Sequence, residues 1–284
     1  MSILQAIVLG MTQGITEFAP VSSSGHLILV PWLFNWHYLL VHPVFNKTFD
    51  VALHMGTLLG AIVYFWRDVV RYLGAWFRSI GHRSIRNVDE KIAWLLIIGT
   101  IPGAIAGAAF ETVIEKKLGQ PGLIAIMLAV FGVILYVVDR HFPQDREMGD
   151  LGFKDAILVG LAQAAALQPG VSRSGVTITA ARALGIERSE AARFSFLLAL
   201  PIIAGAGASK AASLAGGGGL PSGFAWPFFW GVVASAITGF LIIWLVLSYV
   251  RRGSFAPFVI YRIAVAVFVL ALIVAGVRTW HIPS

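Results

Sequence analysis

Apolar blocks of about 20 residues recur along the chain and are separated by short polar segments. The segments 92–110 and 118–138, for example, contain no charged residue. At a rise of about 1.5 Å per residue, an α-helix of this length crosses the roughly 30 Å hydrocarbon layer of a membrane. The pattern predicts six full crossings, at about 49–66, 92–110, 122–138, 194–213, 226–248 and 256–278.

Two further apolar segments, 3–35 and 155–182, do not fit a simple crossing. Each is interrupted in the middle by Pro, Gly and Ser, with the sequence EFAPVSSSGH in the first and QPGVSRSG in the second. A helix that faces lipid does not tolerate such an interruption, because the freed backbone groups would lack hydrogen-bond partners. We therefore expect two re-entrant helical hairpins whose tips line a protected cavity.

The two interrupted segments also resemble each other. AIVLGMTQGITEFAPVSSSGHL, from Ala6, aligns without gaps with AILVGLAQAAALQPGVSRSGVT, from Ala156. Three predicted crossings separate the copies, so the second copy is expected to be inverted relative to the first. Residues 1–284 then form a single integral-membrane domain with an inverted-topology repeat, whose halves are about 1–140 and 151–284 and whose tips meet near the membrane midplane.

The composition supports a membrane protein and excludes a soluble enzyme. Hydrophobic residues make up 58% of the chain and charged residues only 12%, which is more apolar surface than a soluble fold of this length can bury. The expected fold class is therefore an all-α polytopic membrane protein. The absence of cysteine excludes disulfides and thiolate nucleophiles. We recognise no secretory signal peptide, because the first residues lack a basic region.

The net charge of +7 has a topological explanation, and we expect no nucleic-acid partner. Excess Lys and Arg in a membrane protein collect in cytoplasmic loops. The predicted loop after the first crossing is the most basic, and we place it in the cytoplasm with both termini on the opposite side. The Gly-rich segment 214–225 is expected to be a flexible external loop. That basic loop contains Arg67, Arg71, Arg78, Arg83, Arg86 and Lys91.

Ionisable groups inside apolar segments are costly and usually functional. Glu17 is the only acid well inside such a segment, Arg173 is the matching base in the second hairpin, and His26 follows Glu17 by nine residues. The inverted repeat is expected to bring these three together. By contrast, His54 is expected to be a packed or hydrogen-bonded helix residue. Hydroxyl groups surround the three at Ser22, Ser23, Ser24, Ser172, Ser174 and Thr177.

This group of residues suits phosphate chemistry. The planar guanidinium of Arg173 can hold two phosphate oxygens, and the surrounding PGVSRSG provides backbone N–H groups for an anion. Glu17 can hold a divalent cation or move a proton, and His26 can act as a general acid or base, or as a nucleophile. Ser23 is the first choice for an attacking hydroxyl, with directly activated water as the alternative. In a competing interpretation, Glu17 and Arg173 form only a structural ion pair and the serines only cap and pack helices.

The motifs also resemble those of a known family. QGITEFAPVSSSGH, residues 13–26, and PGVSRSGVT, residues 169–177, are similar to the two signature motifs of the undecaprenyl-diphosphate phosphatases, the bacitracin-resistance family. The resemblance continues through 48–67, 194–203 and 255–262. It implies an enzyme of the bacterial inner (plasma) membrane, with its active site open to the periplasmic or external side. Such an enzyme hydrolyses undecaprenyl diphosphate to undecaprenyl phosphate and inorganic phosphate, which recycles the lipid carrier for cell-wall synthesis and confers bacitracin resistance.

The resemblance also assigns residues. It implies Mg²⁺, or another divalent cation such as Ca²⁺, with Glu17 as the protein ligand. Gln13 stands where many members have Glu, and this neutral amide puts a two-carboxylate metal site in doubt. The expected catalytic residues are Glu17, Ser23, His26 and Arg173, and the expected diphosphate-binding residues are Gln13, Ser22, Ser24, Ser172, Ser174 and Thr177.

Two further expectations remain at this point. The Gly- and Ala-rich face at 102–109 would permit the helix contacts of a homodimer. An inverted repeat with re-entrant hairpins is also typical of transporters, so the alternative function is a transporter or flippase for a lipid phosphate or an ion.

Overall fold

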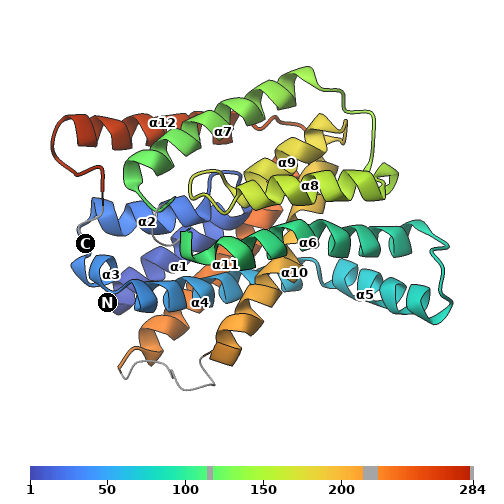
Figure 1. The fold of residues 1–284 in the computed structure, drawn as a ribbon, viewed down its shortest axis with the longest axis horizontal. Helices are drawn as coiled ribbons and strands as arrows, with labels where there is room; N and C mark the ends of the chain where they lie inside the picture. Colours follow the sequence, from blue (N-terminus) through green and yellow to red (C-terminus); the bar gives the residue numbers. More distant parts are fainter. Residues whose placement is uncertain (114–117, 214–222, 282–284) are drawn as a thin grey trace.

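The computed structural model describes residues 1–113, 118–213 and 223–281, and over these residues the chain is helical, with no β-strand (Figure 1). This confirms the predicted all-α class. The predicted external loop at 214–225 lies largely outside the described residues. The helices are α1 (Ile3–Phe18), α2 (Ser23–Leu33), α3 (His37–Val41), α4 (Pro43–Tyr64), α5 (Trp66–Gly81), α6 (Val88–Val113), α7 (Pro121–His141), the 3-10 helix η2 (Met148–Asp150), α8 (Phe153–Ala165), α9 (Arg173–Ala183), α10 (Arg188–Ser213), α11 (Ala225–Val250) and α12 (Ala256–Val274).

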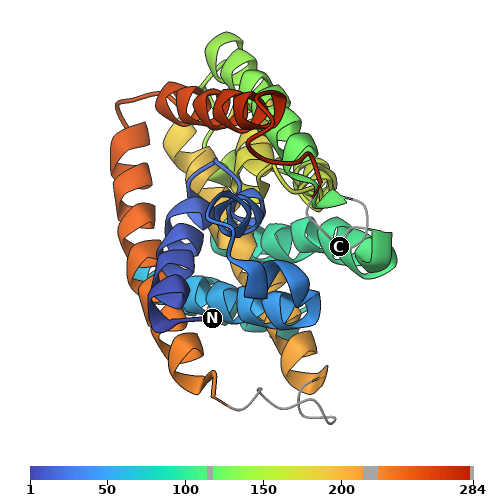
Figure 2. The ribbon, with the colours of Figure 1, turned by 90° about the vertical axis from the view of Figure 1, so that its left-hand side faces the viewer.

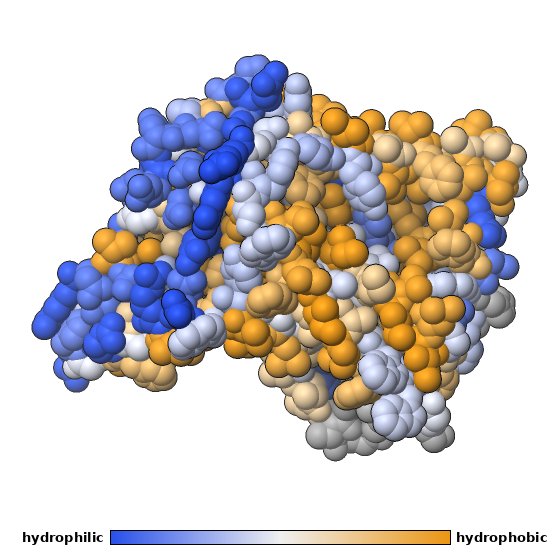
Figure 3. All heavy atoms as spheres, turned by 180° about the vertical axis from the view of Figure 1, so that it is seen from behind, coloured by the Kyte–Doolittle hydropathy of each residue, from blue (hydrophilic) through white to orange (hydrophobic). Residues whose placement is uncertain are grey.

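Five helices in the described part of the chain, α6, α7, α10, α11 and α12, are long and apolar enough to cross a membrane. A sixth candidate is the pair α4 and α5, whose axes differ by 85° across a break at Phe65. The five helices match five of the predicted crossings, and the predicted crossing at 49–66 lies on α4, which is a candidate only together with α5. In Figure 3 hydrophilic residues gather at one end of the molecule, and apolar residues cover most of the remaining visible face. The chain is thus a multi-pass membrane protein.

The segment after the first crossing corrects one prediction. We expected a basic loop beginning near Arg67, but residues 66–81 form the helix α5. Its large apolar residues Trp66, Val70, Leu73 and Phe77 recur every three or four positions and are exposed. This is the period of one helix face, and the arginines occupy the remaining positions. The charges suggested a loop, whereas the apolar spacing determines a helix.

The first and second interrupted segments have the same local structure. Helix α2 begins at Ser23 and α9 begins at Arg173, and each follows a serine with positive φ, 76° at Ser22 and 77° at Ser172. Each of these serine side chains accepts a hydrogen bond from the backbone N–H three residues on, at 3.3 Å and 3.1 Å. Non-glycine residues rarely adopt positive φ, so the matching caps support the predicted similarity of the two segments.

The predicted meeting of the two tips is confirmed. The Gly170 N–H donates to Ser22 Oγ at 3.0 Å, and the Ser174 hydroxyl donates to the Ala19 carbonyl at 3.0 Å. In Figure 2, α1 and α2 lie centrally, with α7, α11 and α12 on their outer sides. The inverted halves and the re-entry of both hairpins into the bilayer remain predictions.

Helix α1 packs against α11 through glycine. A Cβ atom at Gly10 would lie 2.3 Å from the Gly231 carbonyl oxygen, and one at Gly14 would lie 2.7 Å from the Ser235 carbonyl oxygen. Small residues let helix backbones approach closely, which is how helices associate in lipid. The position of Gln13 and Glu17, both on α1, therefore depends on this contact.

We expect Gly14→Ala to lower the free energy of unfolding by about 1–3 kcal/mol, because the added methyl group meets backbone atoms that cannot rotate away. The matched control is Gly205→Ala on α10, where no atom lies within 4 Å of the added Cβ. Alanine favours a helix, so this control is expected to be at least as stable as wild type. Thermal unfolding in detergent measures both, and equal transition temperatures would contradict the packing argument.

Candidate active site

The centre of the site is an ion pair between the two interrupted segments. Arg173, the first residue of α9, donates from Nη2 to Glu17 Oε1, in the last turn of α1, at 2.8 Å. The Glu17 side chain is only 4% exposed and that of Arg173 15% exposed, so water screens the pair little. The structure thus brings together two of the three ionisable groups that the sequence predicted to meet.

The second carboxylate oxygen of Glu17 accepts two further hydrogen bonds. Gln13 Nε2 donates to Oε2 at 2.9 Å from one helical turn earlier, and the Ser23 hydroxyl donates to the same oxygen at 2.5 Å. Glu17 is therefore fixed in orientation and stands beside the hydroxyl that the sequence favoured as a nucleophile. A carboxylate in this position can take the proton of that hydroxyl.

Both ring nitrogens of His26 are hydrogen-bonded. Its Nδ1 lies 2.8 Å from the Ser22 carbonyl, which can only accept, so this nitrogen carries hydrogen. Its Nε2 then accepts from the Tyr261 hydroxyl at 2.8 Å. In the described structure no hydrogen bond joins His26 to Glu17, Ser23 or Arg173. The structure thus shows the expected contact for Glu17 and Arg173, and a meeting of His26 with them stays a prediction, because the ring is hydrogen-bonded to Ser22 and to Tyr261 of α12.

His54 is a site neighbour that the sequence argument missed. Its Nδ1 donates to the Asp50 carbonyl at 2.7 Å, which confirms the expected hydrogen-bonded helix residue. Its Nε2, however, lies 3.5 Å from Glu17 Oε2, and the side chain is 31% exposed. The only sequence signal was a lone polar residue in an apolar crossing.

Most of the other predicted hydroxyls are engaged in holding the loops. Ser22 and Ser172 cap their helices, Ser174 donates to the other loop, and Ser24 lies 3.4 Å from the Ser22 hydroxyl. Thr177 Oγ1 donates to the Arg173 carbonyl at 2.8 Å. These contacts fit the capping and packing interpretation, and a role in diphosphate binding remains a prediction for all five.

Two buried polar atoms next to Glu17 have no hydrogen-bond partner. They are Nη1 of Arg173 and Oε1 of Gln13, a donor and an acceptor. Leaving such groups unpaired costs about 1–3 kcal/mol each, so their persistence at one site points to a ligand. A ligand with anionic oxygens would satisfy the guanidinium. A cation, a water molecule or a hydroxyl group would satisfy the amide oxygen.

The oxygen donors fit a divalent cation only in part. The described residues contain no cluster of three His, Cys, Asp or Glu that could hold a metal. Glu17, the unpaired Gln13 Oε1 and the Ser23 hydroxyl are nevertheless oxygen donors, as Mg²⁺ prefers. Mg²⁺ often uses one carboxylate, several waters and substrate phosphates, so the site fits an ion that arrives with a phosphorylated ligand.

Arg262 on α12 is a second missed residue, although an arginine within a crossing signals function by itself. It is fully buried and donates to Pro20 O at 3.1 Å, Gly170 O at 2.9 Å and Val171 O at 3.1 Å. The Pro20 carbonyl belongs to the tip of the first interrupted segment, and the Gly170 and Val171 carbonyls belong to the tip of the second. Arg262 therefore holds both tips in register.

Arg262→Ala is expected to lower the free energy of unfolding by about 3 kcal/mol or more, because several buried carbonyls lose their donor. Thermal unfolding in detergent checks this, with Arg251→Ala, an exposed arginine, as the control. The free energy of unfolding of Arg262→Lys is expected to lie between those of Arg262→Ala and Arg251→Ala, since one ammonium group cannot reach the carbonyls of both tips. Unfolding of Arg262→Ala at the wild-type temperature would show that the tips need no such donor.

The fold and the site together define a polytopic helical membrane protein with a buried Glu17–Arg173 ion pair between its two interrupted segments. The chain belongs to the family described as bacitracin resistance protein BacA, whose sequence profile matches residues 6–268. It is 45% identical over 272 residues to an undecaprenyl-diphosphatase of Desulforudis audaxviator, which covers 96% of this chain and 98% of the relative. It is 43% identical over 286 residues to an undecaprenyl-diphosphatase of Thermomicrobium roseum, which covers 98% of this chain and 100% of the relative.

Proposed function

We propose that this protein is a membrane phosphatase that hydrolyses undecaprenyl diphosphate to undecaprenyl phosphate and inorganic phosphate. The observation that carries the proposal is Glu17, which accepts from the Ser23 hydroxyl at 2.5 Å and from Arg173 at 2.8 Å. This places a base, a hydroxyl and a guanidinium with an unpaired nitrogen at one buried point. The names of relatives at 42–45% identity over nearly the whole chain support the same reaction.

In the proposed reaction Arg173 Nη1 donates to an oxygen of the terminal phosphate and stabilises the charge that develops there. Glu17 accepts the Ser23 proton as Ser23 Oγ forms a bond to the terminal phosphorus. The bond from that phosphorus to the bridging oxygen breaks, and undecaprenyl phosphate leaves. Water then bonds to the phosphoserine phosphorus as the bond from phosphorus to Ser23 Oγ breaks, Glu17 returns its proton to Ser23 Oγ, and inorganic phosphate leaves as dihydrogen phosphate. A bound Mg²⁺, held by Glu17 and Gln13 Oε1, would neutralise phosphate charge.

The candidate nucleophiles are Ser23, His26 and water, and the proposed reaction uses Ser23. Both ring nitrogens of His26 are hydrogen-bonded, to Ser22 and Tyr261, which makes His26 the weakest of the three. A water molecule activated by Glu17 is the alternative to Ser23. We assign His26 to positioning of the loop that carries Ser23.

The membrane setting follows from the same family assignment. We propose that the protein lies in the bacterial inner membrane, with its hydrophilic end (Figure 3) in the cytoplasm and its site open to the external side. Its long prenyl substrate then stays in the lipid while the diphosphate enters the polar site. A homodimer through 102–109 is a further prediction.

The test is phosphate release from undecaprenyl diphosphate by the purified protein in detergent with Mg²⁺. Ser23→Ala is expected to lower kcat by about 10³-fold or more, because the attacking oxygen is lost. Ser189→Ala, whose hydroxyl bonds Glu187 away from the site, is the control and is expected to keep wild-type activity. If the folded wild-type protein released no phosphate, the proposal would fail and the transporter alternative would lead.

A further inference from the structure

A cavity of about 520 Å³ lies at the bend between α4 and α5, apart from the residues of the candidate active site. It lies about 15 Å along α4 from His54, at 1.5 Å per residue. Three arginines and one aspartate line it, so its charge is positive. The lining residues are Tyr64, Trp66, Arg67, Asp68, Arg71 and Arg193.

Two of the arginines are held in place by the aspartate. Asp68, which is 8% exposed, accepts from Arg71 at 2.8 Å on Oδ1 and from Arg193 at 2.6 Å on Oδ2. Each guanidinium has five N–H donors, so each keeps donors for another group. Their side chains are 46% and 31% exposed, which leaves them accessible from the cavity.

The third arginine has no carboxylate partner within the described part of the chain. Arg67 lies over the ring of Trp66, with its Cζ 5.4 Å from the ring centroid. Asp68 is the carboxylate that lines the cavity, and Asp89 Oδ1 lies 3.8 Å from Arg71 Nε, so two carboxylates face three guanidinium groups. The surplus positive charge suits an anionic ligand with several oxygens.

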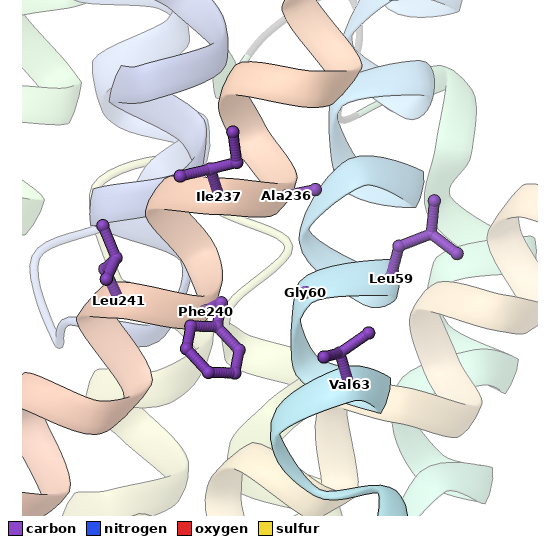
Figure 4. A pocket seen from close by; sticks show the side chains of 7 residues that line it. All are labelled: Leu59, Gly60, Val63, Ala236, Ile237, Phe240 and Leu241. Carbon is purple, nitrogen blue, oxygen red and sulfur yellow. The ribbon is translucent and has the colours of Figure 1, made fainter.

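An apolar groove of about 350 Å³ lies between α4 and α11 (Figure 4). Gly60 lies on the side of α4 that faces α11. A Cβ atom there would come within 2.3 Å of the Ala236 carbonyl oxygen, so the close contact of the two helices requires glycine at this position. The Tyr64 ring, which lines the cavity, packs on Phe240, which lines the groove, with centroids 5.6 Å apart. The other groove residues are Leu59 and Val63 on α4 and Ala236, Ile237 and Leu241 on α11.

We propose that the groove and the cavity form one binding site for an anionic membrane lipid that carries a phosphate in its headgroup. The hydrocarbon chain lies in the α4–α11 groove and the phosphate contacts Arg67, Arg71 and Arg193. Trp66 and Tyr64 are aromatic residues of the kind that lie at the headgroup level of membranes. Basic pockets between membrane helices bind anionic headgroups in this way. The site does not depend on the proposed phosphatase reaction.

The test measures lipid binding to the full-length protein in detergent by native mass spectrometry. The probes are dioleoylphosphatidylglycerol, dioleoylphosphatidylcholine with the same chains but no net charge, and inorganic phosphate. We expect the wild-type protein to bind the phosphatidylglycerol about 5-fold or more tighter than the phosphatidylcholine, because only the former leaves the phosphate charge uncompensated. Inorganic phosphate at equal concentration is expected not to displace it.

Two variants separate the headgroup from the chain. Arg67→Gln is expected to weaken phosphatidylglycerol binding by about 5- to 10-fold, because one charge-assisted contact is lost. Val63→Phe is expected to weaken binding of both lipids, because the added ring fills the groove. Arg252→Gln, an exposed arginine outside the cavity, is the matched control and is expected to bind as wild type does. Thermal unfolding confirms that each variant is folded.

Equal affinity for the two lipids, or equal effects of Arg67→Gln and Arg252→Gln, would overturn the proposal. Displacement of the lipid by inorganic phosphate, combined with no effect of Val63→Phe, would assign the cavity to free phosphate and would also overturn it.

Discussion

Arg173→Ala is expected to reduce phosphate release from undecaprenyl diphosphate by at least about 10³-fold, the upper end of the usual loss from one hydrogen-bond donor. Arg173 has two tasks in this structure, since Nη2 holds Glu17 and the unpaired Nη1 is available to the substrate. The alanine variant loses both. Arg173→Lys keeps the charge but lacks the planar fork, so its ammonium group can serve the carboxylate or the phosphate and not both.

The measurement is kcat and KM for the wild type, Arg173→Ala, Arg173→Lys and the exposed-site control Arg252→Ala. We expect Arg173→Lys to retain more activity than Arg173→Ala and still to lose about 10²-fold in kcat/KM. The control is expected to match the wild type. A folded Arg173→Ala protein within about 10-fold of wild-type activity would remove Arg173 from the reaction.

Glu17→Gln is expected to lower kcat by about 10²–10⁴-fold, because an amide cannot take the proton of the Ser23 hydroxyl. It also leaves the buried Arg173 guanidinium without its counter-charge, which destabilises a protein by about 3–5 kcal/mol. The single variant therefore loses activity and stability together. The competing interpretation, a purely structural ion pair, predicts the same two losses.

The double variant Glu17→Gln with Arg173→Gln separates these interpretations. Two neutral side chains no longer bury an unpaired charge, so the unfolding temperature is expected to recover most of its loss. If the pair were only structural, phosphatase activity would recover with stability. We expect the double variant to be stable and inactive, and thermal unfolding together with the phosphate assay decides the outcome.

The sequence predicted the crossings and the meeting of the two tips because both depend on local patterns. Runs of apolar residues are visible directly, and the interrupted segments share the spacing that places Ser22 and Ser172 at equivalent caps. The pairing of Glu17 with Arg173 followed from the proposed repeat. The sequence could therefore place Glu17 beside Arg173 before any packing was known.

The remaining contacts depend on how separate helices pack, which no local pattern reveals. Tyr261 reaches His26 and Arg262 reaches both tips only because α12 lies against α7. His54 approaches Glu17 because α4 lies beside α1. For α5, the spacing of the apolar residues every three or four positions predicts a helix on its own, but the loop prediction considered only the arginines.

The serine caps have a mechanical consequence for the two loops. Ser22 adopts a left-handed backbone conformation that costs about 1–2 kcal/mol for a residue other than glycine. Its hydroxyl offsets this cost by accepting from Gly25 in its own segment and from Gly170 in the other. Separating the loops would break the hydrogen bond from Gly170 to Ser22, so that less energy would offset the cost of the positive φ at Ser22. The two loops should therefore move as one rigid body, and any motion that opens the site has to come from the helices around them.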